Sequence, residues 1–214
     1  MKFFDLDNCI TESRQIISQE MKKKLLSLSE IFVVISGGEV KRIEKQMDGV
    51  PCIKMGQNGN DTPDWQNKLN KKEIAEILTH IGKIYPYFPD DCVQNRGCQI
   101  SLSFIGHHAP VEKKKKFDPH KKLRFDVLKK IPFRSKTLVA RVAGTTCIDY
   151  NKKGHLKGDN LKRYMKLYKL NPKDCIYFGD NFSKGGNDES VLGVMKCVKV
   201  KDPQDLLLRL KNYE

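Results

Sequence analysis

The sequence has no apolar run of about 18 or more residues, which is the length that a membrane-spanning helix needs, so we expect no membrane partner. Its seven cysteines include no CxxC pair, and neither a structural zinc site nor a paired redox motif is predicted. The first residues do not form the basic and apolar segments of a secretory leader, because Asp5 and Asp7 interrupt them. Together these absences favour a reduced, cytoplasmic protein.

The chain also has fewer acidic than basic residues. Its 40 lysines and arginines exceed its 26 aspartates and glutamates and give a net charge of +14. Such a field attracts anions of any size, from nucleic acid to phosphorylated metabolites. The densest basic run is four consecutive lysines at 113–116. No nucleic-acid reading motif and no row of interleaved aromatic residues accompanies these lysines, so we do not expect nucleic acid as the partner. A solvated lysine face is the simpler interpretation.

Both ends of the chain alternate between strand-like and helical segments. Continuous apolar runs predict strands at 2–6, 31–35, 52–55, 175–178 and 195–200. Helical spacing of apolar residues predicts helices at 16–28, 40–47, 161–170 and 203–210. Alternation of this kind is typical of an α/β fold with a parallel sheet.

The middle of the chain has a different character. Residues 71–84 and 123–128 have helical spacing, whereas 99–105, 137–142 and 145–150 alternate like antiparallel strands. We therefore predict an inserted α+β domain. The expected division is a core in two parts, 1–60 and 153–214, with the insertion at 61–152 between them.

Polar groups follow several of the predicted core strands. Asp5 and Asp7 end the first strand, Ser36 follows the second and Asp180 a later one, while Lys157 opens a helix. Two acids at alternate positions of a strand point to the same side and repel each other unless a cation or a proton lies between them. Because the carboxyl ends of parallel strands share one edge of the sheet, we expect these groups to converge.

These residues resemble the motifs of a known family. Asp5-Leu6-Asp7, Ser36, Lys157 and the Gly-rich loop from Asp180 to Asp188 are similar to the four motifs of the haloacid dehalogenase superfamily of phosphotransferases. Within it, nearly the whole chain resembles the eukaryotic-type α-phosphomannomutase branch. The resemblance implies a Rossmann-like parallel-sheet core with an inserted α+β cap domain, and a homodimer formed through the cap.

The resemblance also implies a catalytic set. Asp5 would be the nucleophile that carries an aspartyl-phosphate, and Asp7 the general acid and base. Ser36 would bind a phosphoryl oxygen, and Lys157 would neutralise the site. The implied cofactor is Mg²⁺, which oxygen ligands suit. The residues implied for it are Asp5, the backbone carbonyl of Asp7, Asp180 and Asp188, with Asn187 ordering its surroundings.

For the substrate, the resemblance implies a small phosphate ester, such as a sugar phosphate gripped at a second phosphate by the cap. The implied substrate-binding residues are Arg14, Arg96, Ser101, His107, Cys147, Asp149 and Asn187. His107 stands where the branch has an arginine and Cys147 where it has a serine. Histidine is mostly neutral at pH 7, whereas arginine is an always charged fork, so the grip on the second phosphate is weakened unless Arg124, Arg134 or the lysines at 113–116 compensate.

This divergence leaves three functions open. A tight cap retains a bisphosphate intermediate and gives a mutase that interconverts mannose 6-phosphate and mannose 1-phosphate. A loose cap lets water attack the aspartyl-phosphate and gives a phosphatase for sugar or other small-molecule phosphates. The third interpretation is a basic, polyanion-binding protein built on an inactive version of the fold.

Overall fold

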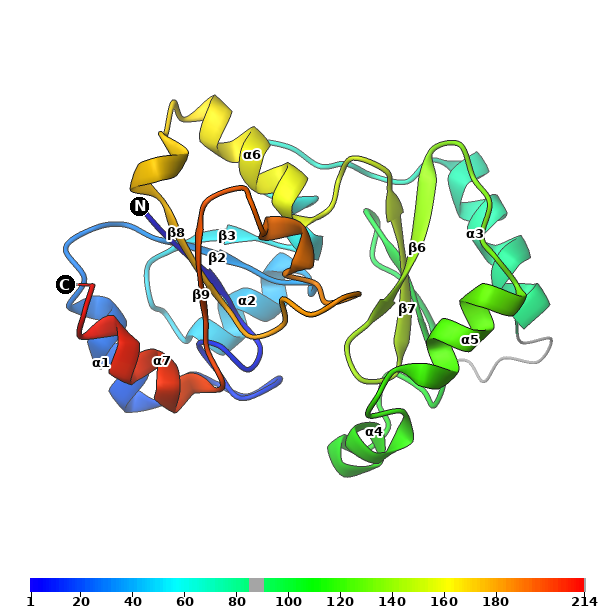
Figure 1. Ribbon diagram of the computed structural model, residues 1–214, viewed down its shortest axis with the longest axis horizontal. Helices are drawn as coiled ribbons and strands as arrows, with labels where there is room; N and C mark the ends of the chain where they lie inside the picture. Colours follow the sequence, from blue (N-terminus) through cyan, green and yellow to red (C-terminus); the bar gives the residue numbers. More distant parts are fainter. Residues whose placement is uncertain (85–90, 214) are drawn as a thin grey trace. The chain divides into compact units, whose positions relative to one another are not determined.

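The apolar runs near both ends of the chain form one five-stranded sheet in the computed structural model, which describes residues 1–84 and 91–213. The strand order is β3-β2-β1-β8-β9, and all neighbouring strands are parallel (Figure 1). The strands are β1 (Lys2–Asp5), β2 (Val33–Ile35), β3 (Ile53–Met55), β8 (Ile176–Gly179) and β9 (Lys196–Lys199). β1 is the central strand, so the side chains that follow it emerge in the middle of the sheet edge.

Successive side chains of these strands pack on opposite faces of the sheet. Phe4 and Val34 belong to a cluster on one face with side chains of α1 (Gln19–Leu26), α2 (Val40–Met47) and α7 (Pro203–Leu210). Phe3 and Val33 belong to a second cluster on the other face with side chains of α6 (Lys157–Leu167) and the 3₁₀ turn η3 (Glu189–Val191). Helices on both faces keep the parallel sheet buried, as parallel sheets require. Two further 3₁₀ turns are η1 (Gln57–Gly59) and η2 (Pro172–Asp174).

The middle of the chain forms a four-stranded antiparallel sheet in the order β4-β5-β7-β6. Its strands are β4 (Val93–Asn95), β5 (Ile100–Ser103), β6 (Leu138–Ala143) and β7 (Cys147–Lys152), and its helices are α3 (Lys71–Ile84), α4 (Val111–Phe117) and α5 (Lys122–Lys130). Ile100 and Leu102 of β5 pack with Ile77 and Ile81 of α3. The alternate side chains of β5, Ser101 and Ser103, lie on the opposite, polar face.

The chain divides into two compact units. The core unit comprises Met1–Gln66 and His155–Glu214, and the inserted unit comprises Asn67–Gly154. The predicted α/β class, a parallel-sheet core with an α+β insertion, is confirmed by these two sheets. The exact domain boundaries stay a prediction. Within the described residues, no helix combines the length and the apolar character that crossing a bilayer demands.

Candidate active site

Three strand ends lie next to each other at one edge of the core sheet. Asp5 is the last residue of β1, its register partner on β2 is Ile35, and Ser36 follows immediately. On the other side, Phe4 pairs with Phe178 of β8, and Asp180 follows the end of that strand. The structure therefore brings these predicted residues to one edge, although they are up to 175 positions apart in the chain.

Lys157 is the first residue of α6, and its side chain reaches this edge of the sheet. Its side chain is fully buried, and its Nζ donates to Asp5 Oδ1 and to Asp188 Oδ1, both at 2.6 Å. Burial alone would lower the pKa of Lys157, but the carboxylates of Asp188 and Asp5 outweigh it and raise the pKa, so the ammonium keeps its charge. A fixed positive charge thus lies against the predicted nucleophile.

Tyr177 is a member of this site that sequence reasoning missed. Its buried hydroxyl donates to Asp188 Oδ1 at 2.6 Å and accepts from Lys157 Nζ at 3.0 Å. Asp188 Oδ2 accepts from the backbone N–H of Asn181 at 3.1 Å, which closes the Gly-rich loop. A Cβ on Gly179 would lie 2.5 Å from Asp188 Oδ2, so this approach needs glycine. In the sequence, Tyr177 is one of a continuous apolar run and gives no signal beyond a core residue.

Asp5, Asp180 and Asp188 are close enough to hold one metal ion, since one carboxylate oxygen from each lies within 4.8 Å of the others. Burial raises the pKa of Asp5 well above its ordinary value, and Asp188 and Asp180 raise it further against the effect of Lys157. Burial and Asp188 raise the pKa of Asp180 to about 6. Three clustered carboxyl groups against one ammonium form a cation-attracting site, and their hard oxygen donors fit Mg²⁺.

The side chain of Asp7 has other partners than the cluster of Asp5, Asp180 and Asp188. Its Oδ2 forms an ion pair with Arg42 Nη2 at 2.5 Å, and its Oδ1 accepts from Gln46 Nε2 at 3.2 Å and from the backbone N–H of Arg14 at 2.8 Å. Arg42 Nη2 also donates to Ser36 Oγ at 3.3 Å. Arg42 and Gln46 lie on α2, and the sequence showed them only as polar positions of an amphipathic helix.

The remaining predicted residues fall into both units. Arg14 and Asn187 belong to the core unit, and the others to the inserted unit. Ser101 Oγ donates to Asp149 Oδ1 at 2.5 Å across the register pair of β5 and β7, and Cys147 pairs with Ser103 in the same ladder.

Arg96 and His107, the two basic positions predicted to grip a second phosphate, have contacts of their own in the inserted unit. Arg96 donates to Gln94 Oε1. His107 is buried and its Nε2 contacts the carbonyl oxygen of Ser101 at 3.1 Å. Burial lowers the pKa of His107, which keeps its ring neutral at pH 7.

Arg124 does not compensate for the missing arginine, contrary to the sequence-based suggestion. It is fully buried, and its guanidinium donates to the carboxylate of Asp118 and to the carbonyl oxygens of Ala143, Gly144 and Cys147. Of the lysines at 113–116, Lys114 is also engaged, since its Nζ donates to the carbonyl oxygen of His107 at 2.6 Å.

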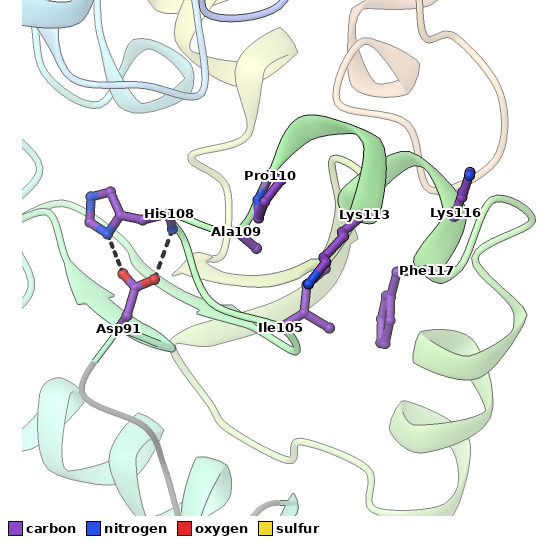
Figure 2. A pocket seen from close by; sticks show the side chains of 8 residues that line it. All are labelled: Asp91, Ile105, His108, Ala109, Pro110, Lys113, Lys116 and Phe117. Atoms are coloured by element: carbon purple, nitrogen blue, oxygen red, sulfur yellow. Dashed lines mark hydrogen bonds and ion pairs between the residues drawn. The ribbon is translucent and has the colours of Figure 1, made fainter.

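The inserted unit has a cavity of about 770 Å³ beside α4, shown in Figure 2. Its lining residues are Asp91, Ile105, His108, Ala109, Pro110, Lys113, Lys116 and Phe117. Asp91 closes one side by accepting from the backbone N–H of His108 at 2.8 Å and contacting its Nδ1 at 2.5 Å. Lys113 and Lys116 belong to the lysine run suggested for the second phosphate, whereas none of the catalytic, metal-binding or substrate-binding residues implied by the resemblance lines this cavity.

The chain is similar in sequence to known phosphomannomutases. No model of a protein family matches the chain. The phosphomannomutase of Encephalitozoon cuniculi is 27% identical over 213 residues, covering 88% of this chain and 82% of that protein. The phosphomannomutase of Schizosaccharomyces pombe is 23% identical over 240 residues, covering 97% of this chain and 91% of that protein.

Among solved structures, a phosphatase of the HAD enzyme superfamily from Bacteroides thetaiotaomicron matches with a TM-score of 0.68 at 14% identity. The match covers 99% of this chain and 94% of that one, and at this identity it shows the fold. With the motif residues gathered at one sheet edge and the phosphomannomutase relatives in sequence, the chain resembles phosphomannomutases and has the fold of haloacid dehalogenase phosphatases.

Proposed function

We propose that this protein transfers a phosphoryl group from a small phosphate ester, with sugar phosphates as the substrate class, through a covalent aspartyl-phosphate. The preferred reaction is that of a phosphomannomutase, between mannose 6-phosphate and mannose 1-phosphate. The observation that carries the proposal is the contact of Lys157 with both Asp5 and Asp188 at the edge where Asp180 also lies. Such a cluster suits phosphoryl transfer, which needs positioning and charge stabilisation above all.

Asp5 would act as the nucleophile. Its Oδ1 accepts from Lys157, and its other oxygen, Oδ2, would attack phosphorus while the bond from phosphorus to the sugar oxygen breaks. Asp7 would give its proton to that leaving oxygen, and in the second half it would take a proton from the acceptor hydroxyl. Ser36 would donate a hydrogen bond to a phosphoryl oxygen.

The metal requirement follows from charge. Mg²⁺, when bound by Asp5, the Asp7 carbonyl and Asp180, supplies the positive charge that lets a carboxylate approach a phosphate. Asp188 is better suited to an indirect role, because Lys157, Tyr177 and the backbone N–H of Asn181 already donate to its two oxygens. Lys157 holds Asp5 in place during the reaction.

Hydrolysis is the second candidate, and one observation favours it. The ring of His107 is buried against the Ser101 carbonyl and stays neutral, so it lacks the charged fork that a second phosphate needs. A charged hydrogen bond contributes about 1.5–3 kcal/mol, so its loss weakens binding of a bisphosphate by roughly tenfold to a hundredfold. Release of the dephosphorylated product before the phosphoryl group is passed back would leave the aspartyl-phosphate to water, which would give free phosphate and restore the carboxylate of Asp5.

The test is a screen of sugar phosphates with Mg²⁺, in the presence and absence of glucose 1,6-bisphosphate. Conversion of mannose 1-phosphate to mannose 6-phosphate that requires the bisphosphate supports the mutase. Release of free phosphate alone supports the phosphatase. Activity that is unchanged after removal of Mg²⁺ by EDTA contradicts the proposed metal.

Two variants test the roles of the aspartates. Asp5→Asn keeps the size of the side chain but removes the nucleophile, so we expect activity to fall to the detection limit. Asp7→Asn should lower kcat by about 10²–10⁴-fold, the usual contribution of general acid–base catalysis. Asp48→Asn is the matched control, because Asp48 is an exposed aspartate at the end of α2 and pairs with Lys22. Full activity of Asp5→Asn contradicts the proposal.

Two broader expectations stay predictions. A homodimer through the inserted unit and a cytoplasmic location follow from the resemblance and from composition. Sedimentation of the purified protein and imaging of a tagged copy in cells test them separately.

A further inference from the structure

Arg42 joins two predicted site residues through a single nitrogen atom. Its Nη2 lies 2.5 Å from Asp7 Oδ2 and 3.3 Å from Ser36 Oγ. Asp7 follows the end of β1 and Ser36 follows the end of β2, whereas Arg42 projects from α2. The guanidinium therefore ties the proposed acid–base group to the hydroxyl proposed for the phosphoryl oxygen.

The other oxygen of Asp7 is held as well. Gln46, one turn further along α2, donates its Nε2 to Asp7 Oδ1 at 3.2 Å and to Thr11 Oγ1 at 2.9 Å. Residues four apart on a helix lie on the same face, so α2 presents Arg42 and Gln46 side by side to the two oxygens of Asp7. Donors to both oxygens restrict rotation of the carboxyl group about its Cβ–Cγ bond.

Gly38 leaves the space that the guanidinium of Arg42 occupies. A Cβ built on Gly38 would lie 2.5 Å from Arg42 Cζ and Nε and 2.7 Å from its Nη2. No real Cβ makes such contacts, so any other residue at this position must push the guanidinium aside. The backbone N–H of Gly38 also donates to Ser36 Oγ at 3.1 Å. The turn after β2 and the first part of α2 thus form one unit around Ser36 and Asp7.

We propose that Arg42 is a positioning residue for phosphoryl transfer, which orients Asp7 toward the leaving oxygen and Ser36 toward the phosphoryl oxygen, and that Gly38 is a glycine because Arg42 needs its space. This inference rests on the proposed function. Arg42 acts through Asp7 and Ser36, and its effect belongs to the chemical step. Misplacing a reacting group by about 1 Å can cost roughly 10²-fold in rate.

The kinetic test compares four variants. Arg42→Ala should lower kcat by about 10–10²-fold while KM changes by less than about threefold, because substrate contacts remain. Arg42→Lys, whose single ammonium can still contact both Asp7 and Ser36, should recover most of the loss. Lys41→Ala and Lys45→Ala are the matched controls, since each removes an exposed positive charge from the same helix, and both should keep wild-type kcat.

Gly38→Ala is a second, independent way to move the guanidinium of Arg42 away from Asp7 and Ser36. In the wild-type background it should lower kcat to a similar extent as Arg42→Ala, because its new methyl group pushes the guanidinium away. In the Arg42→Ala background the same change should alter kcat by less than about twofold, because the space is then empty. Equal effects of Gly38→Ala in both backgrounds overturn the proposal.

Crystal structures of wild type and Arg42→Ala decide the positioning without using activity. We expect the carboxyl group of Asp7 to rotate away from its wild-type direction when Arg42 is absent. If the side chains of Asp7 and Ser36 have the same positions in the Arg42→Ala structure as in the wild type, the proposal is overturned, even if kcat falls. If the wild-type protein transfers no phosphoryl group in any assay, the proposed function fails, and the two structures still give the answer for Arg42.

Discussion

Lys157 and Arg124 are both fully buried basic side chains, but their partners differ in kind. Lys157 contacts two carboxylates and a phenol at the sheet edge where the acids proposed to hold a metal lie. Arg124 is bound by one carboxylate, that of Asp118, and by the carbonyl oxygens around the β6–β7 turn. A lysine is a compact point charge, whereas an arginine fork fixes several acceptors at once. The contacts of Lys157 therefore fit the catalytic role proposed for it, whereas those of Arg124 fit a role in the stability of the inserted unit.

Replacing Arg124 with methionine should destabilise the protein strongly. The change leaves Asp118 buried without its positively charged partner and removes the side-chain donor to three carbonyl oxygens, and breaking a buried ion pair costs about 3–5 kcal/mol. The free energy of unfolding, measured by urea denaturation with circular dichroism, checks this. Arg134→Met, at an exposed arginine of the same unit, should change it by less than about 0.5 kcal/mol. A loss below about 1 kcal/mol for Arg124→Met contradicts this structural role.

Sequence reasoning predicts some of the residues at the edge of the candidate active site and not others. Asp5, Ser36 and Asp180 are predictable because polar residues that directly end apolar strands are hard to explain by folding alone. Tyr177 and Arg42 are not predictable in this way. A tyrosine in an apolar strand and an arginine on an amphipathic helix are the residues that packing and solvation alone would place there. Only the coordinates show that their polar atoms reach Asp188 and Asp7.

At the scale of the elements, segments with a clear apolar pattern are predicted, including the three-residue strands β2 and β3, whereas β4 and α4 are not. The predicted helix at 16–28 is shorter in the structure, because Ser18 caps it by accepting from the backbone N–H of Met21, and α1 ends at Leu26. The edge strand β4 has the sequence Val-Gln-Asn, with one apolar residue, so no apolar run marks it. The lysine run predicted as a solvated face forms most of α4, and Lys114 within it is buried by its bond to the His107 carbonyl.

His80 joins three elements of the inserted unit. It lies on α3, its Nδ1 contacts the hydroxyl of Tyr150 on β7 at 2.9 Å, and its Nε2 contacts the carbonyl oxygen of Ile131, just after α5, at 2.9 Å. A carbonyl oxygen can only accept, so Nε2 carries the proton and Nδ1 accepts from the tyrosine. The neutral imidazole therefore satisfies both contacts, and a second proton would break the one to Tyr150.

We expect His80 to titrate below its ordinary pKa of about 6.5. Burial lowers the pKa of His80, and the hydrogen bond to the Ile131 carbonyl only partly offsets it. Because the folded pKa is depressed, the stabilisation is fully present above about pH 6.5 and is lost as the pH falls below it. Titration of the imidazole C–H signals by NMR measures the value, and His80→Gln, which lacks the signal, assigns it. A pKa at or above 6.5 contradicts the buried, neutral state.

At the scale of the whole molecule, the excess positive charge is uneven. Residues 67–154 contain 19 of the 40 lysines and arginines but only 8 of the 26 aspartates and glutamates, so +11 of the net +14 belongs to the inserted unit. The core unit, which holds the acidic cluster, is nearly balanced. Exposed lysines attract any polyanion, but such attraction is screened over about 8 Å at physiological salt. The charge therefore favours capture of anionic ligands in general without selecting one.

Because most of the excess positive charge and the acidic cluster lie in different units, the polyanion-binding function and the enzymatic function can be tested with different variants. We expect a fluorescent single-stranded oligonucleotide to bind at low salt and to be released by about 0.15 M salt, because non-specific affinity falls steeply as counterions compete. Replacing Lys113, Lys115 and Lys116 with glutamine, while keeping the buried Lys114, should weaken this binding. The matched control replaces three exposed lysines of the core unit, Lys41, Lys45 and Lys199. Fluorescence anisotropy measures the binding. Tight binding at 0.15 M salt that survives Asp5→Asn, together with no phosphoryl transfer by the wild type, would instead support the polyanion-binding function, because only that function is independent of the buried carboxylates.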